Sequence, residues 1–312
     1  MTSEPGRPPI SVVVPTRDRA ALLDPCLASL RRSLGPQDEL IVVDSASKDQ
    51  SVADVARGQG ATLLRCDLPG TSRARNAGWR AARHDLIAFI DDDVRVDPGW
   101  ATALAEAFRS FPDAAYVTCR IGPPPGPVRY VVAQKTDDHA VWLTGEINEG
   151  HSANIGVRRR ALECVDGFDE SLGPGTPLRA AEDLDLFERL IAGGFRGRYE
   201  PAASSYHESW RGTREMFVLQ WSYGIGLGAR LVKIARTDRA RWRSVARWTF
   251  IEDGIKQVFV MIRRRALRWT LLRSTRVAGL VVGIFRAYPR RIVSGHFVPH
   301  RHQPESSRSA PK

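Results

Sequence analysis

The stretch that decides the fold is Leu86-Ile-Ala-Phe-Ile-Asp-Asp-Asp-Val94, in which five apolar residues are followed directly by three carboxylates. A short, continuous apolar run is typical of a strand buried on both faces, as in a parallel sheet covered by helices. Asp91, Asp92 and Asp93 then stand at the carboxyl end of the strand, where open α/β sheets bind their ligands. If the strand persists that far, its alternation directs Asp91 and Asp93 to one side and Asp92 to the other.

Three adjacent carboxylates repel one another, so a divalent cation with oxygen ligands is the expected remedy. A solvated acidic turn is the alternative, because charge clusters usually lie at the surface. The buried strand in front of the carboxylates favours the ligand site.

Strands and helices alternate on both sides of this stretch. Strands are predicted at Ile10–Val14, Glu39–Val43, Thr62–Arg65 and Ala115–Ile121, and helices at Ala20–Leu34, from Ser47 or Asp49 to about Gly58, from Gly70 through Ala82, and near Gly99–Ser110. This alternation indicates βαβ units. The predicted fold class is therefore α/β, with a mostly parallel central sheet flanked by helices.

The proline-rich segment Gly122–Pro127 interrupts the pattern, and we expect a loop or hinge there, between halves at about residues 10–121 and 128–210. The second half is predicted to contain strands at His151–Arg158, Phe195–Tyr199 and Ala203–His207, a helical turn at Arg159–Val165, and an amphipathic helix at Ala181–Ala192. From Arg214 onward we expect helices.

The composition of the chain indicates which broad class of protein it belongs to. The chain of 312 residues is 43% hydrophobic, enough for one large domain or a domain with an extension. The four cysteines, Cys26, Cys66, Cys119 and Cys164, match no metal-binding or redox spacing. Met1–Pro9 lacks the apolar core of a signal peptide, and no run reaches the ~18 apolar residues of a membrane span. We therefore expect reduced thiols in a cytoplasmic protein.

Charge is divided unevenly along the chain. Residues 211–312 contain 22 Lys and Arg against 5 Asp and Glu, a net charge of +17, whereas residues 1–210 carry a net charge of −6. An acidic domain, residues 1–210, and a basic helical extension, residues 211–312, are predicted. The end of the extension is expected to be disordered.

The extension contains apolar residues at helical spacing within Trp242–Trp269. They are Ile251, Ile255, Val258, Phe259, Ile262, Ala266 and Trp269, and Lys256, Arg263, Arg264 and Arg268 lie away from that face. A basic amphipathic helix with Trp suits an anionic membrane surface, which would make the protein peripheral on the inner face of the cell membrane. Alternatively, this face packs on the preceding domain. Nucleic acid is disfavoured, because no binding motif accompanies the charge.

Other polar residues are predicted near the same edge of the sheet. Asp44 ends the second strand and could accept hydrogen bonds from a nucleobase, although a strand-terminal Asp is also a common turn former. Arg73 and Arg75 lie at the entry to a helix, which favours phosphate, with a solvated helix face as the alternative.

Glu182 and Asp183 begin the Ala181–Ala192 helix. They either complement the helix dipole or place a general base over the sheet edge. His207 ends an extended segment, and a lone His is more often structural unless a metal site lies nearby.

Several short blocks resemble, in chain order, those of family 2 glycosyltransferases. They are Val13-Val-Pro-Thr-Arg-Asp-Arg19, Val43-Asp-Ser-Ala-Ser47, Ala74-Arg-Asn-Ala-Gly78, Phe89-Ile-Asp-Asp-Asp93, Asn154-Ile-Gly-Val-Arg-Arg159, Gly167-Phe-Asp-Glu170, Glu182-Asp-Leu-Asp-Leu186, and Pro201 through His207. The resemblance covers about Ile10–Trp210. Each block alone is weak, and their shared order makes the signal specific.

The resemblance implies a GT-A fold and an inverting transfer of a hexosyl or deoxyhexosyl group from a nucleotide-diphosphate donor to an acceptor hydroxyl. Asp44 would bind the base. The donor-binding residues would together be Pro15, Thr16, Arg19, Asp44, Arg75, Asp91 and Asp92.

By the same resemblance, Asp91 and Asp93 match an Asp-x-Asp motif that holds Mg²⁺ or Mn²⁺, with Asp93 the direct ligand and His207 a further one. The metal would neutralise charge on the leaving diphosphate. Asp183 matches the catalytic base, which removes the acceptor proton, and Glu182 stands beside it. Adjacent helical side chains point about 100° apart, so one of the two would face the pocket.

Asp18 stands where the family usually has Asn. The Gln-x-x-Arg-Trp block of processive synthases is absent, which favours single addition in glycan, glycolipid or natural-product synthesis, with a lipid-linked acceptor as one hypothesis. Three other classes of protein are alternatives. A pyrophosphorylase would need a glycine-rich loop in place of Pro15–Arg19, and a dehydrogenase would need glycines spaced differently from those in Gly224–Gly228. A non-catalytic membrane- or nucleic-acid-binding protein on a GT-A-like scaffold remains.

Overall fold

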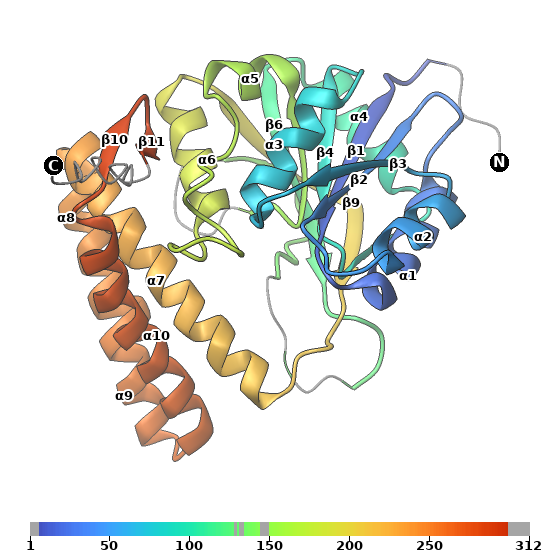
Figure 1. The fold of residues 1–312 in the computed structure, drawn as a ribbon. Coiled ribbons are helices and arrows are strands. Elements are labelled where there is room, and N and C mark those ends of the chain that lie inside the picture. The colour runs from blue at the N-terminus through green and yellow to red at the C-terminus, as the bar shows by residue number, and fades with distance from the viewer. Residues whose placement is uncertain (1–5, 128–129, 131–133, 144–149, 299–312) are drawn as a thin grey trace, which may run out of the picture.

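The computed structural model describes residues 6–127, 130, 134–143 and 150–298. The end of the extension for which disorder was predicted, residues 299–312, lies outside the described residues. Figure 1 shows a sheet with helices on both faces and, beside it, a group of long helices that projects past the sheet.

The described residues form one large sheet and a separate hairpin. In the sheet, β1 (Ile10–Thr16), β2 (Glu39–Ser45), β3 (Thr62–Cys66), β4 (Leu86–Ile90), β6 (Ala114–Gly122) and β9 (Arg196–His207) run in one direction, and β5 (Val94–Val96), β7 (Val141–Trp142) and β8 (Asn154–Arg158) run in the other. The strand order is β3-β2-β1-β4-β8-β6-β9-β5, with β7 on β9. The predicted α/β class with a mostly parallel sheet is confirmed.

Two details of the strand prediction were wrong. The segments predicted as separate strands, Phe195–Tyr199 and Ala203–His207, are one strand, β9. Its register against β6 shifts between Cys119 and Ile121, close to Pro201, which has no N–H to donate to a ladder. The short strands β5 and β7 were not predicted, because two or three residues give no readable alternation.

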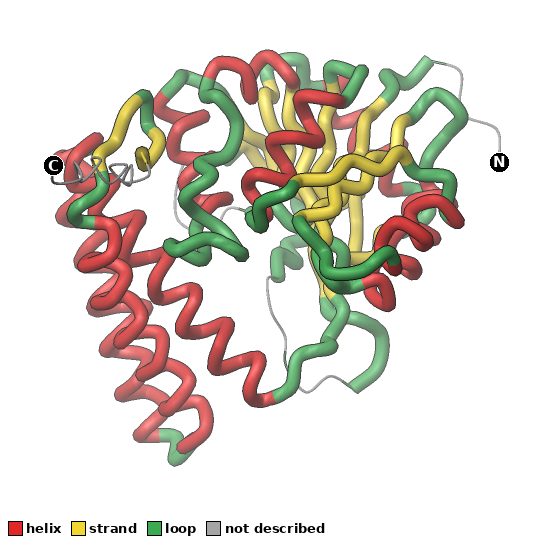
Figure 2. The backbone as a smooth tube through the Cα atoms, in the orientation of Figure 1, coloured by secondary structure: helices red, strands yellow, loops and turns green. Residues whose placement is uncertain are grey.

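Helices cover both faces of the sheet (Figure 2). One face packs on α1 (Ala20–Ser33), α2 (Ser51–Gly58) and α4 (Trp100–Ser110), and the other on α3 (Thr71–Ala81), α5 (Arg159–Cys164) and α6 (Glu182–Ala192). Along β4, Ala88 and Ile90 enter the first core, whereas Ile87 and Phe89 enter the second. The apolar runs are continuous because each strand is buried on both sides.

The extension is helical until its last described residues. It comprises α7 (Thr213–Thr237), α8 (Arg239–Arg247), the π-helix η1 (Trp248–Ile255), α9 (Lys256–Arg263), α10 (Leu267–Ala287), β10 (Arg291–Val293) and β11 (His296–Val298). None of the helices in the described part of the chain is long and apolar enough to cross a membrane.

Two expectations for the extension need correction. The amphipathic pattern of Trp242–Trp269 is divided among α8, η1, α9 and the start of α10, with a turn around Arg265, whose φ is 52°. The described part of the extension also ends in a hairpin, β10 and β11, where helices were predicted. Ser294 and Gly295 both have positive φ (48° and 78°), which matches the right-handed twist of a hairpin turn.

The helices α7 and α10 lie in close backbone contact through glycines spaced four residues apart on each. A Cβ atom at Gly228 would lie 2.1 Å from the Leu280 carbonyl oxygen, and one at Gly283 would lie 2.1 Å from the Ile225 carbonyl oxygen. Residues four apart share one face of a helix, so small residues there let two backbones approach. The glycines of Gly224–Gly228 therefore serve helix packing.

Candidate active site

The three carboxylates at the end of β4 face three different parts of the chain. β4 ends at Ile90 and β5 begins at Val94, so the alternation predicted for Asp91 and Asp93 does not extend to them. Asp91 contacts α3, Asp92 contacts the end of β1 and the loop after it, and Asp93 contacts the segment after β9.

Asp92 fastens the first loop to the strand end. Its carboxylate accepts hydrogen bonds from Thr16 Oγ1 at 2.8 Å and from Arg19 at 3.0 Å. Burial raises the pKa of Asp92 to about 7, against the opposing effect of the Arg19 guanidinium. Pro15 and Thr16 are the last residues of β1, so this contact holds the proposed nucleotide loop against β4.

Asp44 lies at the same edge of the sheet, because it pairs in register with Thr16 of β1. It is buried, accepts a hydrogen bond from the Ser47 N–H at 2.9 Å, and forms an ion pair with Arg65. A carboxylate has about four lone-pair positions, so Asp44 retains capacity for a further donor. Asp18 is in the left-handed region (φ 53°), which Asn and Asp adopt most readily among residues with a side chain.

Asp93 is almost fully buried and has different partners on its two oxygens. Oδ2 accepts hydrogen bonds from Trp210 Nε1 at 2.7 Å and from Arg211 at 3.1 Å, whereas Oδ1 lies 3.3 Å from His207 Nε2. Burial opposes ionisation of Asp93, but His207, Arg211 and Trp210 outweigh it and lower the pKa of Asp93 below its ordinary value.

His207 and Asp93 fit part of a metal site. His207 Nδ1 lies 3.1 Å from the Glu208 carbonyl oxygen, which can only accept, so in the neutral ring Nδ1 holds the proton and Nε2 offers a lone pair. Within the described residues, no group of three His, Cys, Asp or Glu side chains could hold an ion. An ion here would need further oxygen ligands, and in nucleotide sites phosphates supply them. Asp93 and His207 therefore fit Mg²⁺ or Mn²⁺ if a bound diphosphate supplies the remaining oxygen ligands.

Arg75 joins the strand end to α6. It is 1% exposed and donates to Asp91 at 2.7 Å and to Glu182 at 3.1 Å. Burial, reinforced by neighbouring Asp183, raises the pKa of Glu182 to about 7 although Arg75 opposes the shift. Arg73, the other candidate on α3, instead pairs with Glu170 at 3.2 Å.

Asp183 is half-buried in the first turn of α6, and its carboxylate accepts a hydrogen bond from the Leu184 N–H at 2.8 Å. The backbone before it is unusual, since Arg179 and Ala181 have φ of 62° and 68°. Tyr223 of α7 lies near this turn: burial raises the pKa of Tyr223 to about 12, and the Asp183 charge acts in the same direction. The extension therefore borders the candidate base.

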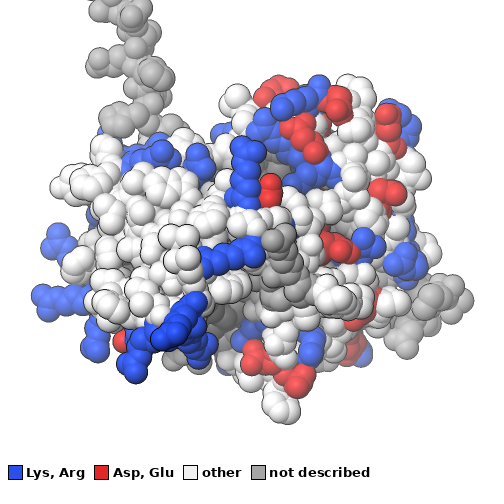
Figure 3. Space-filling model, turned by 90° about the horizontal axis from the view of Figure 1, so that it is seen from below, with Lys and Arg blue, Asp and Glu red and all other residues white. Residues whose placement is uncertain are grey.

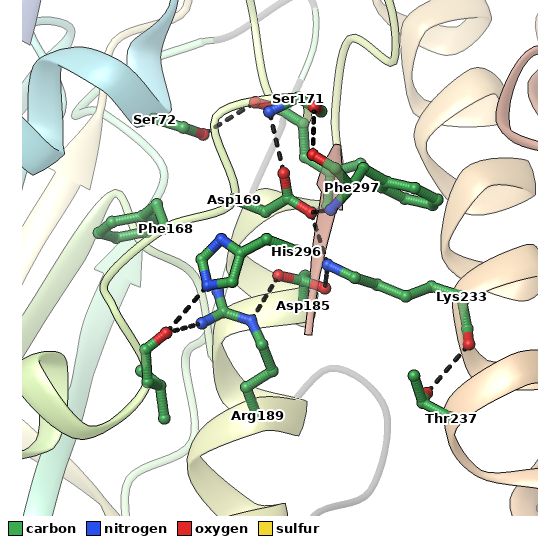
Figure 4. A network of polar contacts seen from close by, with 12 residues as sticks. Ser72, Phe168, Asp169, Ser171, Asp185, Arg189, Lys233, Thr237, His296 and Phe297 are labelled. Atoms are coloured by element: carbon green, nitrogen blue, oxygen red, sulfur yellow. Dashed lines mark hydrogen bonds and ion pairs between the residues drawn. The ribbon is translucent and has the colours of Figure 1, made fainter. Parts of the chain in front are cut away.

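A buried ionic network connects α6 to the extension (Figure 4). Lys233 of α7 donates to Asp169 at 2.6 Å and also contacts Asp185 of α6. Asp185 accepts from Arg189 at 2.9 Å, and Asp169 accepts from the Phe297 N–H of β11 at 2.8 Å. The network fixes α7 and the final hairpin to the helix that carries Asp183.

Sequence reasoning missed Trp210, Arg211 and Lys233. Trp210 and Arg211 follow His207 by three and four residues, and that proximity to a candidate ligand was the available signal. Lys233 could have been noticed as a cation between Leu231-Val232 and Ile234 in an apolar helix, because an interior cation requires a partner.

The sequence matches glycosyl transferase family 2 over residues 11–166. The pre-mycofactocin glycosyltransferase of Mycobacterium tuberculosis (strain CDC 1551 / Oshkosh) is 32% identical over 235 residues, covering 71% of this chain and 47% of that protein. The glucosyl-dolichyl phosphate glucuronosyltransferase of Haloferax volcanii is 26% identical over 161 residues, covering 46% of this chain and 50% of that protein. The chain spans about half the length of these curated relatives.

Solved structures with the same fold include the mannosyltransferase PcManGT from Pyrobaculum calidifontis in complex with GDP-Man and Mn²⁺. Its TM-score is 0.63 at 18% identity, covering 92% of this chain and 90% of that one. S. aureus TarS 1-349 in complex with UDP has a TM-score of 0.53 at 15% identity, covering 92% and 95%. At these identities the likeness concerns the fold, and the predicted GT-A fold is confirmed.

Proposed function

Because the chain belongs to glycosyl transferase family 2, we propose that it transfers a sugar from a nucleotide-diphosphate donor to an acceptor hydroxyl with inversion at the sugar. The observation that carries the proposal is the Arg75 bridge between Asp91 and Glu182. One buried guanidinium joins the ligand edge of the sheet to the turn that begins with Glu182 and Asp183. Arg75 would therefore fix the position of the proposed base relative to the bound donor.

The donor would lie along the carboxyl ends of β1, β2 and β4. Thr16 and Arg19, fixed by Asp92, would line the pocket together with Pro15, and Asp44 would accept from the base. Support comes from the shared edge, where Thr16 and Asp44 are register partners and Thr16 also contacts Asp92.

The donor diphosphate would be bound together with Mg²⁺ or Mn²⁺ held by Asp93 and His207. The ion would neutralise the charge that grows on the leaving diphosphate. Trp210 and Arg211 orient the Asp93 carboxylate so that Oδ1 faces His207. The resemblance also implies Asp91 as a metal ligand, but in this structure its carboxylate accepts a hydrogen bond from Arg75. Its proposed contribution to metal binding would begin when the donor binds.

Asp183 is the proposed general base. Glu182 is buried and bonded to Arg75, whereas Asp183 is half-buried and borders α7. A base must reach the acceptor proton, and a carboxylate committed to a buried ion pair is less suited to that task.

The proposed reaction is a single addition in glycan, glycolipid or natural-product synthesis. A lipid-linked acceptor is the preferred hypothesis, since the basic extension suits an anionic membrane surface on the cytoplasmic side. A non-catalytic binding protein is the second candidate, and the intact Arg75 bridge favours the enzyme over it.

A donor screen tests the proposal, with nucleoside diphosphate release measured against a panel of sugar nucleotides in Mn²⁺. Asp183→Asn should lower turnover by ~10²-fold or more while donor binding is largely kept, the scale of general-base catalysis. Glu163→Gln, an exposed acidic residue on α5, is the matched control and should behave as wild type. Absence of turnover with every donor would contradict the function. If turnover fell only slightly in Asp183→Asn but severely in Glu182→Gln, the assignment of Asp183 as the base would be contradicted.

A further inference from the structure

The turn between α9 and α10 carries apolar side chains that face solvent. Phe259, Ile262 and Leu267 are 61%, 52% and 72% exposed, and α9 has no buried residue. This turn lies at the end of the helical extension that projects furthest past the sheet (Figures 1 and 2). Of the predicted apolar face, Trp269 contacts Tyr130 of the preceding domain with ring centroids 5.9 Å apart, whereas Phe259 and Ile262 are left exposed.

The apolar surface continues along α10. Exposed residues recur at alternate spacings of four and three, which places them on one side of the helix. They are Leu267, Leu271, Ser274, Ala278, Val281, Phe285 and Tyr288. Gly279 and Gly283 contact α7 instead, so this row is the outward side of α10.

Three consecutive arginines, Arg263, Arg264 and Arg265, form the turn itself and are exposed. No ion pair joins them to an acidic residue in the described part of the chain, and α9 and α10 contain no Asp or Glu. The nearest acidic residues in sequence are already paired, Glu252 with Lys256 at 2.8 Å and Asp253 with Arg276 at 2.7 Å.

We propose that this turn, the docking tip formed by Phe259, Ile262, Arg263, Arg264, Arg265 and Leu267, binds the anionic phospholipid headgroups of a membrane surface. The arginines meet the headgroup charge while the three apolar side chains enter the boundary between headgroups and acyl chains. Figure 3, viewed toward this end of the molecule, shows a mostly uncharged surface over the extension with Lys and Arg at its margins, whereas Asp and Glu gather over the sheet domain.

A second copy of the chain is the competing occupant of this surface. The row on α10 could pair with its equivalent, but neither copy would offer a carboxylate to the three arginines. Each copy would also bring the +17 charge of residues 211–312 to the same contact. Charge complementarity therefore favours an anionic lipid surface.

Vesicle flotation of the full chain tests the docking tip. Phosphatidylcholine vesicles with phosphatidylglycerol should bind the protein at low salt, and vesicles of phosphatidylcholine alone should bind it far less. R263Q/R264Q/R265Q should weaken partitioning to the anionic vesicles by about tenfold or more. F259S/I262S/L267S should remove the binding that survives high salt. R32Q/R57Q/R83Q makes the same charge change at exposed positions on the sheet domain and should leave binding unchanged.

The inference rests on the proposed function only in that a lipid-linked acceptor would lie at the same surface. Vesicle flotation measures binding alone, so its result does not depend on whether the protein is an active transferase. Nucleoside diphosphate release with a soluble acceptor, measured on the same variants, shows separately whether the transferase proposal fails. The proposal would be contradicted if the wild-type protein did not bind anionic vesicles at low salt, or if the variants of the docking tip bound them as well as the wild type does. A dimer seen by light scattering and dissociated by F259S/I262S/L267S would reassign the surface to contact between copies.

Discussion

Replacing Lys233 by Met removes the cation that ties α7 to α6, and we expect this change to destabilise the protein strongly. Lys233 is buried, and its Nζ donates to Asp169 at 2.6 Å and contacts Asp185. Methionine keeps most of the side-chain volume, so the change removes charge rather than packing. Two carboxylates that are 1% and 2% exposed would lose their shared partner.

The magnitude follows from the partners that remain. Breaking a buried ion pair from one side costs about 3–5 kcal/mol, because the other charge stays buried. Here Asp185 keeps Arg189 at 2.9 Å, and Asp169 keeps the Phe297 N–H at 2.8 Å. We therefore expect the lower end, about 3 kcal/mol of unfolding free energy, or a fall of about 5 °C in the Tm of a chain of 312 residues.

The same substitution should change the response to acid. Burial opposes ionisation of Asp185, but Arg189 and Lys233 lower its pKa below the ordinary value. A carboxylate with a depressed folded pKa stabilises the protein above its unfolded pKa, and that stabilisation is lost as the pH falls through the folded pKa. Without Lys233 the folded pKa of Asp185 rises, so acidification removes less stabilisation from Lys233→Met than from wild type, and the difference in unfolding free energy between the two proteins should narrow as the pH falls.

Scanning calorimetry at neutral pH and along an acid series measures both effects. Lys256→Met is the matched control, because Lys256 is 61% exposed and its pair with Glu252 at 2.8 Å is screened by solvent and should contribute little to stability. The double variant K233M/D169N should recover much of the loss, since Asp185 keeps Arg189 as its partner and Asp169 no longer carries a charge. A Lys233→Met protein as stable as the Lys256→Met control would refute the reasoning.

Two further predictions concern the metal pair and the helix contact. Asp93→Asn should abolish any gain in nucleoside diphosphate affinity on adding Mn²⁺, measured by calorimetry, whereas Asp85→Asn, 96% exposed, should retain it; a wild type with equal affinity in both conditions would contradict the metal assignment. Gly283→Val should lower the unfolding free energy by about 1–3 kcal/mol, because its Cβ would lie 2.1 Å from the Ile225 carbonyl oxygen. Gly58→Ala, where a Cβ meets nothing within 4 Å, is the control, and equal melting temperatures for the two variants would count against the contact.

The sheet could be predicted from the sequence because its strands are buried on both faces. In β1, Val12 and Val14 enter one core and Val13 the other, so three consecutive apolar residues are buried on alternate faces. The same logic placed Asp44 and Asp91–Asp93 at strand ends. Their orientations could not be predicted, since these depend on partners far away in sequence, such as Arg211, which is 118 residues from Asp93.

The extension was harder to predict because local helical spacing does not detect a short turn. Residues 264–266 interrupt the helix after Arg263, yet Ile262, Ala266 and Trp269 still fit a helical pattern across the break. The π-helical η1 shifts the phase again. The role of Lys233 could be predicted only in part, for a different reason: the sequence shows a cation in an apolar run but does not identify the carboxylates, Asp169 and Asp185, that neutralise it.

The contacts of the extension argue that it is part of the catalytic unit. Arg211, just before α7, binds Asp93, and Lys233 in α7 binds Asp185, two residues after Asp183. The segment from Arg211 through α7 thus contacts the carboxylate proposed to bind the metal and the helix that carries the proposed base. The glycine contacts fix α10 against α7, and a helix of 21 residues spans about 30 Å. A docking tip bound to a membrane would therefore hold the site at a set distance and orientation above the surface, so that lipid-linked acceptors of matching reach are selected by geometry.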